Sequence, residues 1–562
     1  MTDSSRKTPD LWLFTLAFAL ALALRLVYLG WLPLSDAEAT WALQAFDLVK
    51  GHSPALGAQP AYVMLTALVF FIMQASNFAA RLIPAVAGAL LVFAPLFFRD
   101  RLGSKTAIIL AFGLAIDPGL LSLSRQAGTP IITVMALVFA WGCWQSHRTE
   151  WAGFFTGLAL LSGPQLWPGL AGLGLAIFMS RSLLDEATAI KFERKTILTT
   201  LAYAAGTYLL VGSLFLLAPG GLGQGLATIP EYFGGWLGES ETSIVQMTIA
   251  LLASQAYALI FGLVGLARGL RERDPFTTFA GMWFGIALVL ALSYPSREVA
   301  HLAWAILPLW ALAARETSRH LTPIQNGTWE TIGMAVLTTA ILVFAWFNFS
   351  AVALTNPDPN TAVLRWYVLA GALGLLLLST ILVALGWSRE SAIQGSAWGF
   401  MGILLISTLS TAISTAGLRT YRTTELWRSS PQVAQSTMLA SQLDDLSRFK
   451  RGAQASLDIS IVGINSTALR WMLRDWHVTI MDNADVTTAP SLVLTKLEDT
   501  NPALQASYRG QEILWRTYTG WDQFIPADWL KWLAVHTAPQ GEERIILWSR
   551  TDLFVDSQNI QP

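Results

Sequence analysis

The feature that most constrains this chain is a succession of apolar segments from Leu11 to about Gly417. A helix needs about 20 apolar residues to cross the hydrocarbon core of a bilayer. The chain of 562 residues is 54% hydrophobic and only 13% charged, whereas soluble domains carry about 25% charged residues. This excludes a soluble multidomain enzyme, a disordered scaffold and, at a net charge of -1, a nucleic-acid binder with a basic surface. We predict a polytopic α-helical membrane protein.

The apolar segments are predicted to form about thirteen transmembrane helices. Basic residues gather in alternate connections, beginning with Arg6 and Lys7 and including Arg99, Lys191 and Arg268. Because cytoplasmic loops carry the excess of Lys and Arg, the N-terminus is predicted to be cytoplasmic in the plasma (inner) membrane. The predicted spans are 11–30, 80–98, 106–122, 129–145, 151–163, 165–180, 197–217, 244–266, 277–293, 299–314, 331–352, 363–385 and 395–416.

The first outer connection is predicted to hold two juxtamembrane helices between residues 35 and 75. Counting the apolar segment from Pro60 to Gln74 as a crossing would invert every later loop against the charge rule. We therefore expect this segment to lie at the outer membrane face or to dip into it. The segment from Asp36 to Val49 has helical periodicity, and Ser35 or Asp36 is its predicted N-cap.

Residues 1–418 are predicted to form the transmembrane domain, and residues 419–562 a small extracytoplasmic α/β domain. Strands are predicted at 456–463, in HVTIMD and in SLVLTKL, with a helix at 465–476 and two further strands in EILWRTYTGW and RIILWSRTDLF. This part contains no Gly-rich phosphate loop, metal-ligand spacing or nucleophile elbow. The single cysteine, Cys143, permits no internal disulfide.

Charged residues left at the predicted outer face are the informative ones, because each is costly near hydrocarbon. Arginine binds phosphate in a bidentate manner, and a carboxylate can accept a proton from an attacking hydroxyl. Together they suit a phosphate-bearing ligand and a general base. The residues are Asp36, Glu38, Asp117, Arg125, Glu231, Glu239, Glu241, Arg297, Glu298 and His301.

Each of these residues also has a structural interpretation. Asp36 suits a helix N-cap and Glu38 a favourable first-turn acid. Arg81, at the start of a span, suits a snorkelling side chain. The two outer arginines could pair with their acidic neighbours, His301 could be an interior hydrogen-bonded residue, and the glutamates at 231–241 most simply form a solvated loop.

The order of four segments resembles the polyprenol-phosphate-sugar glycosyltransferases of the GT-C superfamily, which include protein O-mannosyltransferases and the lipid A aminoarabinose transferase. A subgroup named for a flippase-associated role in glycan export is also similar. The resemblance covers most of the membrane part. It is carried by SDAEATWALQAFDLVKG, by QPAYVMLTALVFFIMQASNFAARLIPAVAGALLV, by LSLSRQAGTPIITVMAL and by REVAHLAWAILPLWALAA.

The resemblance implies a GT-C-like fold and roles for individual residues. Asp36 or Glu38 would be the catalytic base, and Arg125 and Arg297 would bind the donor phosphate. We expect Gln59, Tyr62, Asp117 and His301 to line the same cavity. The chain departs from the family where Ala37 separates the two acids, where the usual tyrosine is replaced around His301, and where no lysine stands near Gln59.

The implied activity is transfer of a sugar from a polyprenyl-phosphate donor to a lipid, glycan or protein acceptor hydroxyl, by inverting displacement at the outer membrane face. No cofactor is predicted, and a requirement for a divalent cation is left open. The alternatives are a lipid-linked glycan flippase or transporter and a non-catalytic glycan-export accessory protein. A transporter usually shows repeated halves with broken spans at matching positions, and neither is clear here.

Overall fold

A computed structural model describes residues 8–181, 194–240, 242–321, 327–355, 359–418, 424–428, 430–482, 489–498 and 504–554. Arg6, Lys7 and Lys191, which support the predicted orientation, lie outside these ranges, as does Glu241. The predicted boundary after residue 418 adjoins residues 419–423, which also lie outside them.

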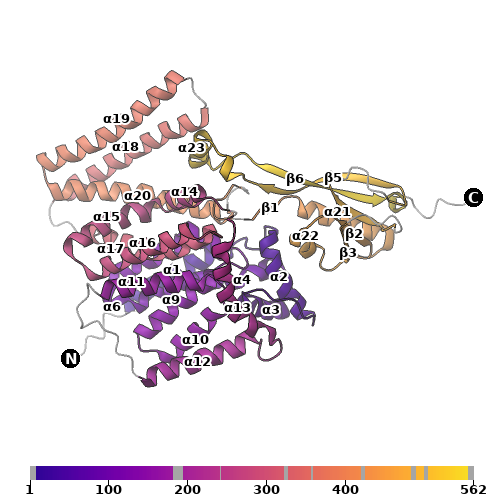
Figure 1. Ribbon diagram of the computed structural model, residues 1–562. Helices are drawn as coiled ribbons and strands as arrows, with labels where there is room; N and C mark the ends of the chain where they lie inside the picture. Colours follow the sequence, from indigo (N-terminus) through magenta and orange to yellow (C-terminus); the bar gives the residue numbers. More distant parts are fainter. Residues whose placement is uncertain are drawn as a thin grey trace, which may run out of the picture.

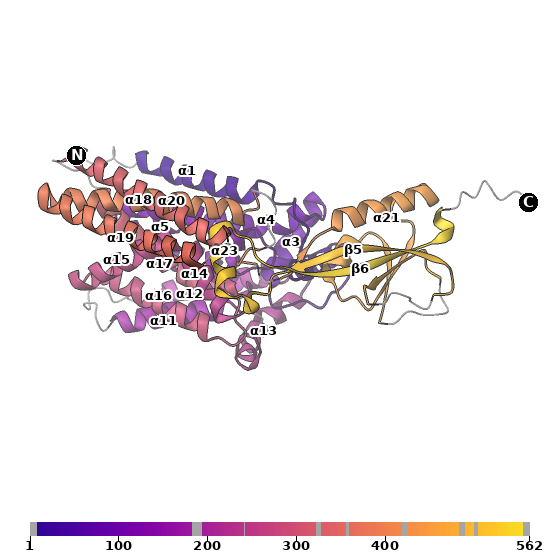
Figure 2. The ribbon, with the colours of Figure 1, turned by 90° about the horizontal axis from the view of Figure 1, so that it is seen from above.

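Two parts make up the molecule, a bundle of helices and a sheet domain that extends from one end of it (Figures 1 and 2). Every segment predicted as a span contains helix. The helices of the bundle are α1 (Thr8–Leu26), α4 (Asn77–Leu90), α5 (Ala94–Phe97), α6 (Arg99–Leu102), α7 (Ser104–Ile116), α8 (Pro118–Ser124), α9 (Ile131–Gln145), α10 (Thr149–Leu160), α11 (Leu166–Arg181), α12 (Arg194–Gly212), α14 (Ile244–Ser254), α15 (Ala256–Glu272), α16 (Pro275–Ser293), α17 (Ala303–His320), α18 (Thr328–Thr355), α19 (Pro359–Gly386) and α20 (Arg389–Thr415).

Within the described residues, 5 helices are long and apolar enough to cross a membrane, or up to 7 if each of two bent pairs forms one span. The pair α7 and α8 bends by 54° at Asp117, where Pro118 begins the second helix. The pair α14 and α15 bends by 84° at Gln255. The count of about thirteen crossings stays a prediction.

The first outer connection forms the two predicted helices, α2 (Asp36–Val49) and α3 (Pro60–Met73). Ser35 caps α2, because its hydroxyl accepts from the Glu38 backbone N–H while the Glu38 carboxylate accepts from the Ser35 N–H. This reciprocal pair satisfies two amides that a helix start leaves open. The alanines at 39, 42 and 45 of α2 are fully buried, which lets α2 pack closely against its neighbours.

A third helix outside the predicted spans corrects one expectation from the sequence. The segment predicted as part of a long loop forms α13 (Gly220–Gly234), followed by a turn of 3-10 helix, η3 (Gly235–Leu237). Glycine is a poor helix former. Because the sequence of α13 is rich in glycine, no helix was predicted there. Tyr232 is buried and stacks on Tyr294, with 5.1 Å between ring centroids, which shows that packing holds α13 in place.

The C-terminal part is a six-stranded mixed sheet with helices, which confirms the small α/β domain. The strand order is β1-β5-β6-β4-β2-β3; β2 pairs in parallel with β3 and β4, and the other pairs are antiparallel. The elements are β1 (Gln432–Val433), α21 (Ser436–Arg451), β2 (Asp458–Val462), α22 (Thr467–Met472), β3 (His477–Met481), β4 (Leu492–Lys496), β5 (Tyr508–Tyr518), η5 (Trp521–Gln523), α23 (Pro526–Val535), β6 (Gly541–Arg550) and η6 (Thr551–Phe554).

Candidate functional site

A cavity of about 200 Å³ lies where the helix bundle meets the sheet domain. Its walls come from segments far apart in the chain, and most of these segments are the starts of helices. The wall residues are Ser35, Ala37, Glu38, Trp41, Gln59, Leu123, Gln126, Ala127, Gly128, Thr129, Pro130, Pro164, Gln165, Glu231, Glu298, Val299, Ala300, Trp427 and Ser430. We call this space the junction cavity.

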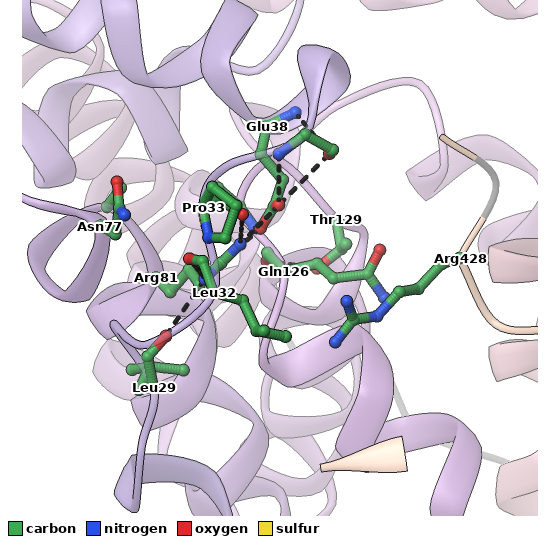
Figure 3. A network of polar contacts seen from close by, with 12 residues as sticks. Leu29, Leu32, Pro33, Glu38, Asn77, Arg81, Gln126, Thr129 and Arg428 are labelled. Carbon is green, nitrogen blue, oxygen red and sulfur yellow. Dashed lines mark hydrogen bonds and ion pairs between the residues drawn. The ribbon is translucent and has the colours of Figure 1, made fainter. Parts of the chain in front are cut away.

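Glu38 is one of the predicted bases, and its carboxylate lies in the wall of the junction cavity. Arg81, from α4, holds it with two bonds, Nε to Oε1 at 2.6 Å and Nη2 to Oε2 at 2.7 Å (Figure 3). The backbone N–H of Ala127 donates to Oε1 at 3.0 Å, and that of Ser35 to Oε2 at 3.0 Å. Arg81 is therefore a partner of Glu38 in this structure, and the snorkelling interpretation is not what the structure shows.

Arg81 also ties down the connection between α1 and α2. Its Nη1 donates to the carbonyls of Leu29 and Leu32, and its Nη2 to the carbonyl of Pro33 at 3.0 Å (Figure 3). Burial is the largest influence on Glu38 and raises its pKa. Arg81 and the backbone hydrogen bonds together lower that pKa by more, so the net shift is downward. Glu38 is thus a fixed anion and a weak proton acceptor.

Asp36, the other predicted base, faces the sheet domain and is not a wall residue of the cavity. Its Oδ1 accepts from the Ser466 hydroxyl at 2.7 Å and from the Ala468 backbone N–H at 2.9 Å, and its Oδ2 lies 2.6 Å from Nη2 of Arg516. Nearby, Trp471 of the sheet domain donates to Asn77 of α4 at 2.8 Å. In this structure Asp36 joins the two parts of the molecule.

Glu231 and Glu298 bring two further carboxylates to the cavity wall. Glu231 is exposed as a whole, and the burial of one side of it raises the pKa of its carboxyl group. No hydrogen bond or ion pair joins its carboxylate to another residue in the described ranges. A carboxylate with a raised pKa and no fixed donors is well suited to accept a proton. The sequence placed Glu231 among the outer-face charges and predicted a solvated loop as its simplest setting, because nothing in a single sequence shows that α13 folds against the cavity.

Several helices begin at the cavity, whose wall carries three carboxylates, those of Glu38, Glu231 and Glu298, and no basic side chain. Gln59 directly precedes α3, Pro130 precedes α9, Gln165 precedes α11, and Glu298 precedes the 3-10 turn η4 (Val299–Leu302) that leads into α17. The N-cap residues of α3 and α9, Gln59 and Pro130, make no side-chain capping hydrogen bond. At the start of α3 the Ala61 amide donates to the Leu161 carbonyl at 2.9 Å, and the first amides of α11 donate to the carbonyls of Gly163 and Pro164. Helix N-termini present unpaired amides and the positive end of the helix dipole, and they are established binding sites for anions.

The two predicted phosphate ligands lie next to these helix starts, with their guanidinium groups outside the cavity wall. Arg125 donates through Nη1 to the carbonyls of Leu24, Arg25 and Val27, at the end of α1, over distances of 2.8 to 2.9 Å. Arg297 donates through Nε to the carbonyl of Thr242 at 2.9 Å. Neither pairs with its acidic neighbour in the manner that the sequence allowed.

Of the four residues expected to line the cavity, only Gln59 does so. Tyr62 is buried and donates to the Ala80 carbonyl at 2.8 Å. Asp117 caps α8 and accepts from Nε1 of Trp310 at 2.7 Å. His301 is buried, with its Nδ1 2.9 Å from the Glu298 backbone nitrogen. These three side chains are turned into the packed interior, where hydrogen bonds compensate their burial.

Two glutamine side chains of the cavity wall have an unused acceptor. Oε1 of Gln59 and Oε1 of Gln165 are buried and have no hydrogen-bond partner among the described residues. A buried acceptor without a partner costs free energy, about 1–3 kcal/mol, and such groups commonly serve a ligand. Trp427, also in the wall, is held by a 3.1 Å bond from its Nε1 to the Ser254 hydroxyl. Gln165 and Trp427 were not predicted from the sequence as site residues.

Acidic, histidine and cysteine side chains do not form a metal site in the described ranges, where no group of three or more is placed to hold an ion.

No protein-family model matches this sequence, and no curated protein matches it. The fold is similar to that of ArnT from Cupriavidus metallidurans. In its structure bound to undecaprenyl phosphate, ArnT aligns with a TM-score of 0.57 and 14% identity, over 97% of this chain and 99% of that chain. The apo structure of ArnT aligns with a TM-score of 0.54 and 14% identity, over 96% and 98% of the two chains. The predicted GT-C-like fold is confirmed.

Proposed function

We propose that this protein is a membrane glycosyltransferase that moves a sugar from a polyprenyl-phosphate donor to an acceptor hydroxyl in the junction cavity. The observation that carries the proposal is the convergence of carboxylates and helix N-termini on one cavity of an ArnT-like fold. A carboxylate serves the attacking hydroxyl, and helix N-termini serve the leaving phosphate. The predicted orientation would place this chemistry at the extracytoplasmic face of the plasma membrane.

The donor phosphate is proposed to lie against the starts of α9 and η4. Gly128 has a φ of 72° and leads into the start of α9, and the Trp41 ring packs against it where a Cβ would otherwise lie. Arg125 and Arg297 precede these two helix starts by a few residues. Each guanidinium already donates to the protein backbone. We therefore propose that the two arginines do not bind the phosphate directly but add positive charge behind the cavity wall.

Glu231 is proposed to take the proton, and Glu38 to shape the wall. Five donor groups, two on Arg81, two on Ser35 and one on Ala127, hold the Glu38 carboxylate, whose pKa is lowered. Glu231 lacks such donors within the described ranges, and its pKa is raised. Glu38, one of the two bases predicted from the resemblance, is tested beside it.

In the proposed step, the acceptor oxygen forms a bond to the anomeric carbon as the bond from that carbon to the phosphate oxygen breaks. The electron pair of the broken bond leaves with the polyprenyl phosphate, whose charge the helix N-termini stabilise. The acceptor proton passes to the carboxylate. The product is a glycoside of inverted anomeric configuration.

The test is a transfer assay with purified protein in lipid nanodiscs and a panel of polyprenyl-phosphate sugars and hydroxyl acceptors. We expect release of polyprenyl phosphate with formation of glycoside. Glu231→Gln should lower kcat by about 100-fold or more, as loss of a general base does, while Glu239→Gln, a nearby glutamate outside the wall, should keep activity. If Glu38→Gln loses activity and Glu231→Gln keeps full activity, the base is Glu38 and not Glu231. No transfer with any donor would refute the proposed function.

A further inference from the structure

A second, polar pocket of about 130 Å³ lies between the helix bundle and the sheet domain. Thr242 and Gln246 contribute the bundle side of the pocket. The sheet-domain side combines the end of β5 with η5 and with the segment before β1. Its wall residues there are Glu425, Arg428, Ser430, Pro431, Gln432, Thr517, Tyr518, Thr519, Gly520, Trp521 and Asp522. We call this space the sheet pocket.

One short segment separates the sheet pocket from the junction cavity. Trp427 lines the junction cavity, Arg428 lines the sheet pocket, and Ser430 lines both. The segment is anchored on the bundle, because the Trp427 carbonyl accepts from Gln126 at 3.2 Å and the Leu426 carbonyl accepts from Gln246 at 3.4 Å. A molecule that occupies the sheet pocket therefore lies directly beside the space proposed for the reacting sugar.

The sheet pocket carries hydroxyl groups that the protein leaves without partners. Thr517 is 7% exposed, and its Oγ1 is buried with no hydrogen-bond partner among the described residues. The same holds for Oγ1 of the half-buried Thr519. Both hydroxyls belong to wall residues of this pocket. Unpaired buried hydroxyls are costly, and a ligand rich in hydroxyl groups would pair with them.

The remaining wall residues narrow the class of ligand. The pocket has one cation, Arg428, and two acids, Glu425 and Asp522, so its wall does not favour a phosphate-bearing ligand. Nη1 of Arg428 donates to the Gln432 side chain at 2.7 Å, so one of its donor groups is already occupied. Trp521 and Tyr518 add aromatic surface to the hydroxyl and amide groups. This mixture suits a neutral saccharide, which presents hydroxyl groups at its edge and C–H groups on its faces.

We propose that the sheet pocket binds a neutral saccharide unit of the acceptor and so presents the neighbouring hydroxyl to the junction cavity. This assignment rests on the proposed glycosyltransferase function. It makes the acceptor a glycan or glycolipid, and it gives the sheet domain the task of selecting it.

The experiment measures equilibrium binding of neutral saccharides to the full-length protein in nanodiscs, without any donor. The probes are N-acetylglucosamine, galactose, glucose and mannose disaccharides, observed by saturation-transfer NMR and titrated for affinity. Inorganic phosphate is the charged probe. The double variant Thr517→Val/Thr519→Val removes both hydroxyls and keeps the side-chain shape, whereas Thr517→Ser/Thr519→Ser keeps the hydroxyls. Thr479→Val, on the exposed face of β3, is the matched control.

We expect at least one disaccharide to bind, with affinity weakened about tenfold in the valine variant, as for loss of neutral hydrogen bonds, and retained in the serine variant and the control. Binding that is equal in the valine variant, or no saturable binding by any disaccharide, would overturn the proposal. Phosphate binding that depends on the two threonines would replace it with an anion site. Saccharide binding by a protein that transfers no sugar would refute the proposed function alone.

Discussion

The contact between Arg81 and Glu38 allows a quantitative prediction. Arg81→Met keeps an apolar stem in α4 but removes two charge-assisted hydrogen bonds to Glu38, at 2.6 and 2.7 Å, together with three bonds to backbone carbonyls. The side chains of the pair are only 4% and 7% exposed. Removing one partner of a buried pair leaves an uncompensated charge and typically costs about 3–5 kcal/mol. We expect a loss of this size, which is a large part of an ordinary domain's stability.

The pH dependence of this loss has a defined sign. In the native protein the pKa of Glu38 lies below its ordinary value of 4.5, so the pair stabilises the fold above pH 4.5 and this contribution is lost as the pH falls further. Without Arg81 only burial and the backbone donors remain, and burial raises the pKa of Glu38. The variant therefore loses stability as the pH rises through and above 4.5. The difference between the two proteins should grow from pH 4 to pH 7.

The assay is unfolding in detergent by an added denaturant, followed by tryptophan fluorescence at pH 4, 5, 6 and 7. Arg101→Met is the matched control, because Arg101 is exposed and bonds only to the Gln145 side chain at 3.1 Å. It should change the free energy of unfolding by less than about 0.5 kcal/mol. The double variant Glu38→Leu/Arg81→Met should recover part of the loss. A loss below about 1 kcal/mol in Arg81→Met, or a loss that does not vary with pH, would refute the reasoning.

Three further predictions follow from other contacts. Asp36→Asn and Arg516→Met should each loosen the sheet domain and raise its rate of cleavage in limited proteolysis; unchanged cleavage would contradict the docking role of Asp36. Gly128→Ala should lower the thermal midpoint, because Gly128 has a φ of 72° and an added Cβ would lie 2.1 Å from the Trp41 ring; an unchanged midpoint would show that this turn relaxes freely. The acid limb of kcat/KM against pH should report the raised pKa of Glu231 and therefore lie above that of an ordinary carboxyl group, and Glu231→Gln should lack that limb.

Local sequence signals predicted the helices near the site well. The bounds of α2 are those predicted, Asp36 to Val49, and α3 ends one residue before the predicted Gln74. Ser35 proved to be the N-cap, a role that depends only on residues within one turn. Five strands of the sheet domain were also predicted, since alternating or buried apolar runs mark strands directly.

Contacts between residues far apart in the chain could not be predicted from the sequence. Arg81 and Glu38 are separated by 43 positions, and a membrane-interface role was predicted for Arg81 because a single sequence does not show which residue faces it. The Asp36 carboxylate accepts a hydrogen bond from Ser466, which lies 430 positions later in the sequence. Glu231 was assigned to a loop because its helix is rich in glycine, and packing on Tyr294 outweighs that low propensity. These pairings arise only when helices and sheet come together.

The measurement that tests the account most directly is an experimental structure of the protein with a non-transferable polyprenyl-phosphonate sugar. The account predicts the sugar in the junction cavity, with its phosphonate at the starts of α9 and η4 and the Glu231 carboxylate on the opposite face of the anomeric carbon. A head group bound midway along the helix bundle, away from Glu38 and Glu231, would contradict the account and favour transport of the lipid-linked sugar.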